Sequence, residues 1–310
     1  MIRKRKTRGL GGHKRLNQPP FGYFGSKNRL ALELCRNLPP HNAWVEAFCG
    51  SAAVTLAKSP APIEVINDID DQIVNLFQQL RTRPRELCRM VALTPYAREE
   101  LSLARKSKPS NDSLEMARRF LVESMMAVNG VFGKECGGFS YSLSYSRQNR
   151  EARVNRWYNL PERLSKVVER LRTVRVEKRN AIALLKDYLD KPATLVYLDP
   201  PYFTKRTNGY NRDANDVNFH KELLALANKA RCMIMLSGYD NTLYKKTLSR
   251  DLGWTSRRIK TTTKDSLGRT HARTEVVWMN RQYTEALKNK RIGLRLSHSE
   301  RKSSKVNPSR

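Results

Sequence analysis

A short apolar run that ends at an acid is the feature that most constrains the fold. Residues 194–198 (Thr-Leu-Val-Tyr-Leu) are predicted to form a buried β-strand, and Asp199-Pro200-Pro201-Tyr202 follows it directly. In open α/β sheets, ligands bind outside the carboxyl ends of the strands, so this tetrapeptide is a candidate site. The alternative is an ordinary Pro-Pro turn in which Asp199 only caps a neighbouring group.

A second acid follows a predicted strand earlier in the chain. Residues 43–57 predict a strand, a tight turn at Cys49-Gly50-Ser51 and a helix, which is typical of the nucleotide-binding corner of a doubly wound sheet. The next predicted strand, 63–66, leads to Asp68, close to the spacing of about 20 residues at which an acid would hold a ribose. The alternative role for Asp68 is to cap the helix that follows.

The alternation of strands and helices divides the chain. It stops near residue 85 and resumes near residue 172. We therefore expect an α/β domain with a Rossmann-like, doubly wound sheet from residues 18–84 and 172–280, and a mostly helical insert from residues 85–171. Two runs, 254–262 and 274–279, predict a hairpin at the sheet edge. Residues 281–310 are predicted to be a basic, partly helical or disordered tail.

The insert contains a long stretch, residues 129–158, that we predict to be irregular. It combines glycines and aromatic residues with arginines and amides. Arginine and amide side chains read base edges in the major groove, and aromatic rings stack on bases or wedge between them. We expect a DNA-recognition loop, with a disordered solvated loop as the alternative. The candidate DNA-binding residues are Asn129, Arg147, Asn149, Arg150 and Arg153.

The charge of the chain indicates a polyanionic partner. There are 59 Lys and Arg against 29 Asp and Glu, a formal charge of +30, and residues 1–17 form a basic arm that we predict to be flexible. A generally basic surface and a membrane surface are the alternatives, although no stretch approaches the roughly 20 apolar residues that span a bilayer. The five cysteines are scattered without a Cys-x-x-Cys pair, which argues against zinc and disulfides and favours a reducing, intracellular location.

One further block precedes these motifs. Tyr23-Phe24-Gly25-Ser26-Lys27 leads into a predicted helix whose free N–H groups would suit an anion. In its order of motifs, the chain from about residue 20 to 280 resembles the Dam-type DNA adenine-N6 methyltransferases. That family has an aromatic-Gly-Lys block, a Phe-x-Gly-x-Gly corner (here Phe48-Cys49-Gly50-Ser51-Ala52), a target-recognition insert and Asp-Pro-Pro-Tyr. Ala52 stands where the family has its second glycine.

The resemblance implies S-adenosylmethionine as cofactor and no metal. It implies that Asp199 and the carbonyl of Pro200 accept hydrogen bonds from the amino group of a flipped-out adenine, with Pro201 in the same motif and Tyr202 stacking on the base. Asn180 is a candidate contact to an adenine ring. The residues that the resemblance assigns to the cofactor are Tyr23, Gly25, Lys27, Phe48, Gly50, Asp68 and Asp199.

Other functions stay open at this stage. Related enzymes with Asn-Pro-Pro-Tyr act on RNA bases or on a protein glutamine, and Ser-Pro-Pro-Tyr favours cytosine N4. A basic nucleic-acid-binding protein without catalysis would also explain the charge, but not two acids that follow predicted strands. The resemblance implies a monomer in the cytoplasm of a bacterial or phage-infected cell, with double-stranded DNA as partner and a restriction endonuclease as a candidate companion.

Overall fold

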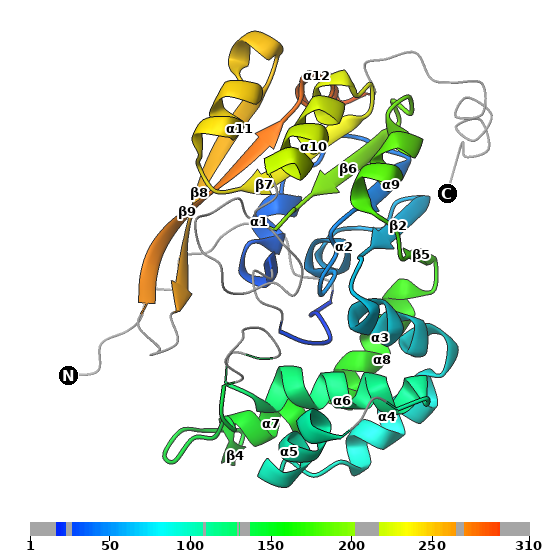
Figure 1. Cartoon of the computed structure of the whole chain (residues 1–310), viewed down its shortest axis with the longest axis vertical. Helices are drawn as coiled ribbons and strands as arrows, with labels where there is room; N and C mark the ends of the chain where they lie inside the picture. The colour runs from blue at the N-terminus through cyan, green and yellow to red at the C-terminus, as the bar shows by residue number, and fades with distance from the viewer. Residues whose placement is uncertain are drawn as a thin grey trace.

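The structure is a computed structural model that describes residues 17–22, 27–107, 110–128, 130, 137–201, 217–264 and 270–291. Its main sheet has seven strands in the order β5-β2-β1-β6-β7-β9-β8 (Figure 1). The strands are β1 (Ala43–Glu46), β2 (Ile63–Asn67), β5 (Val174–Glu177), β6 (Thr194–Leu198), β7 (Met233–Gly238), β8 (Thr255–Lys264) and β9 (Thr270–Met279).

The sheet is doubly wound, as predicted. Strands β5, β2, β1, β6 and β7 are parallel, and the chain runs outward in one direction from β1 and in the other from β6. The carboxyl ends of the neighbouring strands β1 and β6 therefore mark the switch point of the sheet, where α/β proteins bind ligands. Strand β9 lies antiparallel between β7 and the edge strand β8, so the predicted edge hairpin is confirmed.

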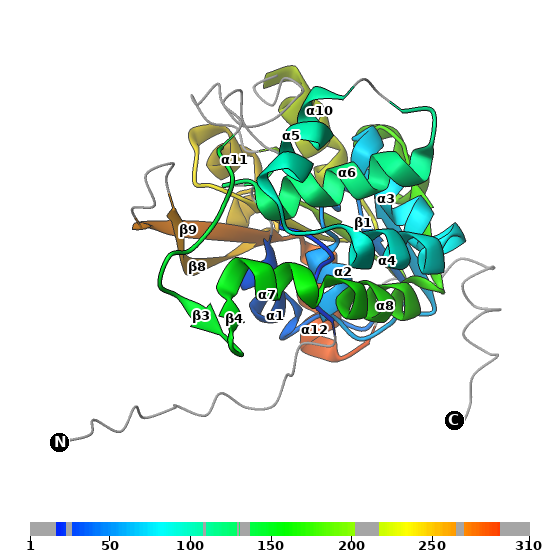
Figure 2. The same cartoon turned by 90° about the horizontal axis from the view of Figure 1, so that it is seen from below.

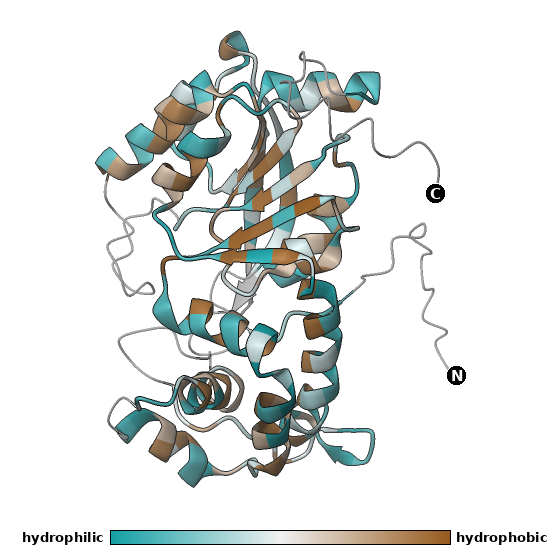
Figure 3. Ribbon diagram, turned by 90° about the vertical axis from the view of Figure 1, so that its right-hand side faces the viewer, coloured by the Kyte–Doolittle hydropathy of each residue, from teal (hydrophilic) through white to brown (hydrophobic). Residues whose placement is uncertain are grey.

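Helices cover both faces of the sheet, which explains why the central strands are buried and mostly apolar. Val196 and Leu198 of β6 pack with α9 (Ala181–Tyr188), α10 (Val217–Lys229) and α11 (Thr242–Thr247). Leu195 and Tyr197 pack on the other face with α1 (Ala31–Cys35), α2 (Ala53–Ala57) and α12 (Arg281–Asn289). Figure 3 shows apolar residues along the central strands and polar residues over much of the outer helices.

Helix α12 lies in the stretch that the sequence predicted to be a basic tail. Its Tyr283 is 3% exposed and packs in the core, and the Tyr283 hydroxyl donates to the carbonyl of Asn37 at 2.8 Å. Residues 281–289 therefore belong to the packed structure. Within the described ranges, none of the helices has both the length and the apolar content needed to cross a membrane.

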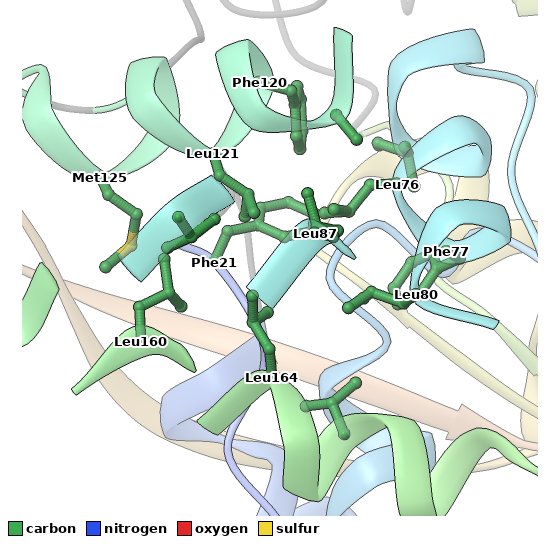
Figure 4. Close-up of a cluster of buried hydrophobic side chains, with 14 of the residues drawn as sticks. Phe21, Leu76, Phe77, Leu80, Leu87, Phe120, Leu121, Met125, Leu160 and Leu164 are labelled. Carbon is green, nitrogen blue, oxygen red and sulfur yellow. The ribbon is translucent and has the colours of Figure 1, made fainter. Parts of the chain in front are cut away.

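The helices of the insert pack around a hydrophobic core that they share with the corner after β1 and with strands β2 and β5 (Figure 4). The helices around it are α3 (Asp71–Thr82), α4 (Pro84–Leu93), α5 (Arg98–Lys106), α6 (Ser113–Met126), α7 (Ala152–Tyr158) and α8 (Leu160–Leu171). Phe21 belongs to the same core and meets the edge of Phe120, with ring centroids 4.9 Å apart. The insert is thus packed against the segment that leads into Lys27.

The predicted irregular stretch is only partly irregular. The described residues 137–158 contain a two-stranded hairpin, β3 (Ser146–Arg147) and β4 (Arg150–Glu151), followed by α7. The hairpin turn consists of Gln148 and Asn149, both with positive φ, and it lacks the glycine that usually marks such a turn in a sequence. Helix α7 was missed because its apolar face is short; Trp157 is buried and donates to the carbonyl of Thr94 at 2.8 Å.

Candidate active site

A buried lysine between two carboxylates forms the centre of the candidate site. Asp199 directly follows β6, and the Nζ atom of Lys27 lies 2.7 Å from its Oδ1. The same Nζ lies 3.4 Å from Oε1 of Glu275 on β9. Burial alone would lower the pKa of Lys27, but the two carboxylates outweigh burial and raise the pKa above its ordinary value. Lys27 is therefore a cation that lies between two acidic side chains.

A third carboxyl group lies at the end of β1. Oε2 of Glu46 accepts the N–H of Thr55 at 2.9 Å and also the Thr55 hydroxyl. Burial raises the pKa of Glu46 to about 7, the bonds from Thr55 oppose that shift, and the charge of Asp199 adds to it. Sequence reasoning missed Glu46 and Glu275. Glu46 is an acid at the end of an apolar strand run, which is a signal that could have found it, whereas Glu275 follows polar residues on β9 and only the fold reveals its burial.

The turn after β1 is tied to the acid after β2. Gly50 has φ +47° and donates its N–H to Oδ2 of Asp68 at 2.8 Å. Oδ1 of Asp68 accepts the N–H groups of Ile69 and Asp70. Burial raises the pKa of Asp68. The alternative in which Asp68 caps the next helix is wrong, because the side chain that caps α3 is that of Asp70.

Ala52 adopts a backbone conformation that glycine would adopt without strain. It has φ +53° and ψ +35° and is fully buried at the start of α2. A left-handed conformation costs an L-residue roughly 1–2 kcal/mol. The turn keeps its hydrogen bond from Ala52 N–H to the Cys49 carbonyl at 2.7 Å. This chain thus tolerates a methyl group at the turn at the cost of backbone strain.

Comparison with known proteins identifies the family. Residues 23–263, which include the corner, the insert and Asp199-Pro200-Pro201, match the D12 class of N6 adenine-specific DNA methyltransferases. The chain belongs to this family. It is an S-adenosylmethionine-dependent DNA adenine methyltransferase with a Rossmann-like sheet, as the order of its motifs predicted.

Solved structures give only distant likenesses. A precorrin 8W decarboxylase from Methanobacterium thermoautotrophicum is 10% identical, with a TM-score of 0.35 over 85% of this chain and 98% of that chain. A precorrin-6y C5,15-methyltransferase from Geobacter metallireducens is 12% identical, with a TM-score of 0.35 over 84% and 92% of the two chains. Likenesses of this size carry no inference about activity.

The described residues of this methyltransferase fit its cofactor. A carboxylate has about four lone-pair positions, and main-chain N–H groups take three at Asp68, which leaves one for a ribose hydroxyl. The two acidic side chains beside Lys27 would suit a sulfonium cation. Phe48 is half-buried, and its ring meets the edge of Phe219 with centroids 6.2 Å apart, so it forms part of the wall behind the corner.

Other predicted residues have different outcomes. The side-chain oxygen of Asn180 accepts the N–H groups of Ile182 and Ala183 and caps α9, which gives that oxygen a structural role. Pro200 is buried and Pro201 half-buried next to Asp199. The remaining predicted residues, Tyr23, Gly25, Asn129 and Tyr202, lie outside the described residues.

The predicted DNA-binding arginines lie on the hairpin and the start of α7. Arg147, Asn149 and Arg150 form the exposed hairpin end, and Arg153 is exposed on the first turns of α7. The guanidinium of Arg150 lies 4.1 Å from the ring centroid of Tyr158, which helps to fix the hairpin against the helix. Figures 1 and 2 show this hairpin on the same side of the methyltransferase as the long β8–β9 ribbon.

Proposed function

We propose that this methyltransferase binds S-adenosylmethionine across the carboxyl ends of β1, β2 and β6. Asp68 would hold the ribose, and Lys27 and Asp199 would hold the methionine part. The cofactor, when bound, supplies an activated methyl group on its sulfonium. The observation that carries the proposal is the ion cluster of Lys27, Asp199 and Glu275 at the switch point of the sheet.

Asp199 and Pro200 are the proposed acceptors for the adenine amino group. The ion pair with Lys27 favours the ionised form of Asp199, and an ionised carboxylate only accepts hydrogen bonds. The ring of Pro200 fixes its φ, which helps to aim its carbonyl. Two acceptors on the amino hydrogens favour a localised nitrogen lone pair, so catalysis rests on positioning and electrostatics. From the sequence, Tyr202 is the proposed stacking face for the base.

The hairpin is the proposed element for recognition of double-stranded DNA. A two-stranded ribbon fits the major groove, where arginine pairs with guanine and asparagine with adenine. Asn149 at the turn and Arg147 beside it are exposed at the hairpin end. Arg150 and Arg153 would bind the backbone or neighbouring bases.

One experiment separates this function from its alternatives. The purified protein is incubated with methyl-labelled S-adenosylmethionine and either duplex DNA or duplex RNA of the same sequence, and the methylated bases are identified by mass spectrometry. We expect N6-methyladenine in DNA only. Methylcytosine, or label confined to RNA, would contradict the proposed substrate. No label together with no calorimetric heat from the cofactor would indicate a DNA-binding protein without catalysis.

A further inference from the structure

Two arginines meet the main chain at the base of the insert. Nη2 of Arg163, on α8, donates to the carbonyl of Pro20 at 3.2 Å and lies 3.8 Å from the sulfur of Met125. Nη2 of Arg156, on α7, lies 3.2 Å from the position that a Cβ atom on Gly22 would occupy. Both guanidinium groups therefore contact residues 20–22, a short distance before Lys27 in the chain.

Neither arginine has a carboxylate partner among the residues that the structure describes. Burial lowers the pKa of Arg163 to about 10, and the charge of Arg156 contributes to that shift. Burial and the charge of Arg153 likewise lower the pKa of Arg156. Nε of Arg163 is buried without a hydrogen-bond partner. Two like charges with an unsatisfied donor are unfavourable in a half-buried place unless an anion binds there.

We propose that Arg156 and Arg163 form a phosphate site that holds one backbone phosphate of the bound DNA at the base of the insert. The planar guanidinium group binds phosphate through two parallel hydrogen bonds. The absence of a side chain at Gly22 leaves room for the Arg156 group. This site rests on the proposed function, because it takes DNA as the ligand.

The charges around the pair favour DNA as the source of the phosphate. Arg150 and Arg153 are exposed, and Arg156 and Arg163 are half-buried further along the same chain segment. They continue the proposed DNA-binding residues from the hairpin inward, toward the segment before Lys27. A strand that follows them would be held at several phosphates between the recognition hairpin and the catalytic edge. The carboxylate of the cofactor is the competing anion, and the experiment distinguishes the two.

The first measurement is the salt dependence of DNA binding by Arg156→Met. Loss of one phosphate contact should reduce the slope of log K against log salt by about 0.9. It should weaken specific and non-specific duplexes alike, by about tenfold at a fixed low salt concentration. Arg156→Lys keeps the charge but not the two parallel bonds and should recover most of the slope. Arg85→Met, at an exposed position on α4, removes the same charge and should keep the wild-type slope.

Two further readouts make the proposal falsifiable. Without DNA, Arg156→Met should unfold at the same temperature as the wild type or higher, because a poorly compensated cation has been removed. If the salt slope of Arg156→Met equals that of the wild type, the phosphate site is wrong, whatever the unfolding temperature. A loss of calorimetric affinity for S-adenosylmethionine with normal DNA binding assigns the pair to the cofactor carboxylate and also overturns it. If the wild type binds no DNA, the proposed function itself fails.

Discussion

Helix α8 carries one buried or half-buried arginine near each end, and the two have opposite surroundings. Arg170 makes two bonds to the carboxylate of Glu64 on β2, at 2.5 and 2.8 Å, and Glu64 also binds Nζ of Lys58 at 2.7 Å. Arg163, seven residues earlier, faces Arg156 and has no carboxylate among the described residues. Arg170 thus has a carboxylate partner, whereas Arg163 has none among the described residues, and the proposed phosphate would supply its anion.

The difference distinguishes a structural contact between the insert and the sheet from a proposed binding surface. Arg170 also donates to the carbonyl of Thr55 at 3.0 Å, and Thr55 binds Glu46 at the end of β1. The partnered end of α8 is thus connected to the candidate active site by consecutive hydrogen bonds. Buried ion pairs are costly to break and add little to stability when intact, so their value here is to fix the insert in one position.

The largest effect is expected at the third charged cluster, around Lys27. Asp199→Ala removes the proposed acceptor and should lower methyl transfer about a thousandfold or more, while DNA affinity persists because the basic insert is unchanged. Asp187→Ala, which removes an exposed aspartate paired with Arg179, is the matched control and should keep full activity. If Asp199→Ala transfers methyl groups at the rate of the control, Asp199 is not the acceptor for the adenine amino group.

The next effect tests the partnered end of α8. Glu64→Gln leaves Arg170 and Lys58 buried without their carboxylate and should lower the free energy of unfolding by about 3–5 kcal/mol. Urea unfolding gives the value. Glu162→Gln breaks a pair with Lys166 on the same helix and should change stability very little, because solvent screens this exposed pair. If the two variants lose the same free energy of unfolding, the buried cluster does not fix the insert against the sheet.

At the unpartnered end of α8, a substitution should change the free energy of unfolding much less. Arg163→Met removes a charge without a carboxylate but also the bond to Pro20, so we expect a change of no more than about 1 kcal/mol in the free energy of unfolding. Arg170→Met on the same helix should be clearly less stable than the wild type. If Arg163→Met is as destabilising as Arg170→Met, the contrast between the two ends of α8 is wrong.

A further expected effect is a dependence of the free energy of unfolding on pH. The pKa of Glu46 rises from 4.5 to about 7 in the folded protein, so between these values the folded state binds more protons than the unfolded state. Stability from this group is therefore present below pH 4.5 and lost as the pH rises to 7. Glu46→Gln should remove that loss, which unfolding curves of both proteins at pH 5 and pH 7 would measure. If the wild type and Glu46→Gln lose the same free energy of unfolding between pH 5 and pH 7, Glu46 does not titrate in that range.

The sequence predicted the order of the elements well because the signals are local. Residues 181–188 form the helix predicted for them, and Pro161 lies in the first turn of α8 as expected. The partners of buried charges are not local: Lys27 meets an acid on β9, and Arg170 meets one on β2. Nothing in the amphipathic pattern of α8 distinguishes Arg163 from Arg170. Only the folded arrangement shows which of them has a carboxylate.

The position of the insert also has a consequence for how the chain folds. Strands β2 and β5 are neighbours in the sheet, yet Asn67 pairs with Glu177, 110 positions further along the chain. Closing a flexible loop of that length costs about 4 kcal/mol of chain entropy. Helices with mostly local contacts form quickly, so the insert is expected to fold first and bring β5 next to β2. Variants that loosen its core should then delay completion of the sheet, even where the finished enzyme is fully active.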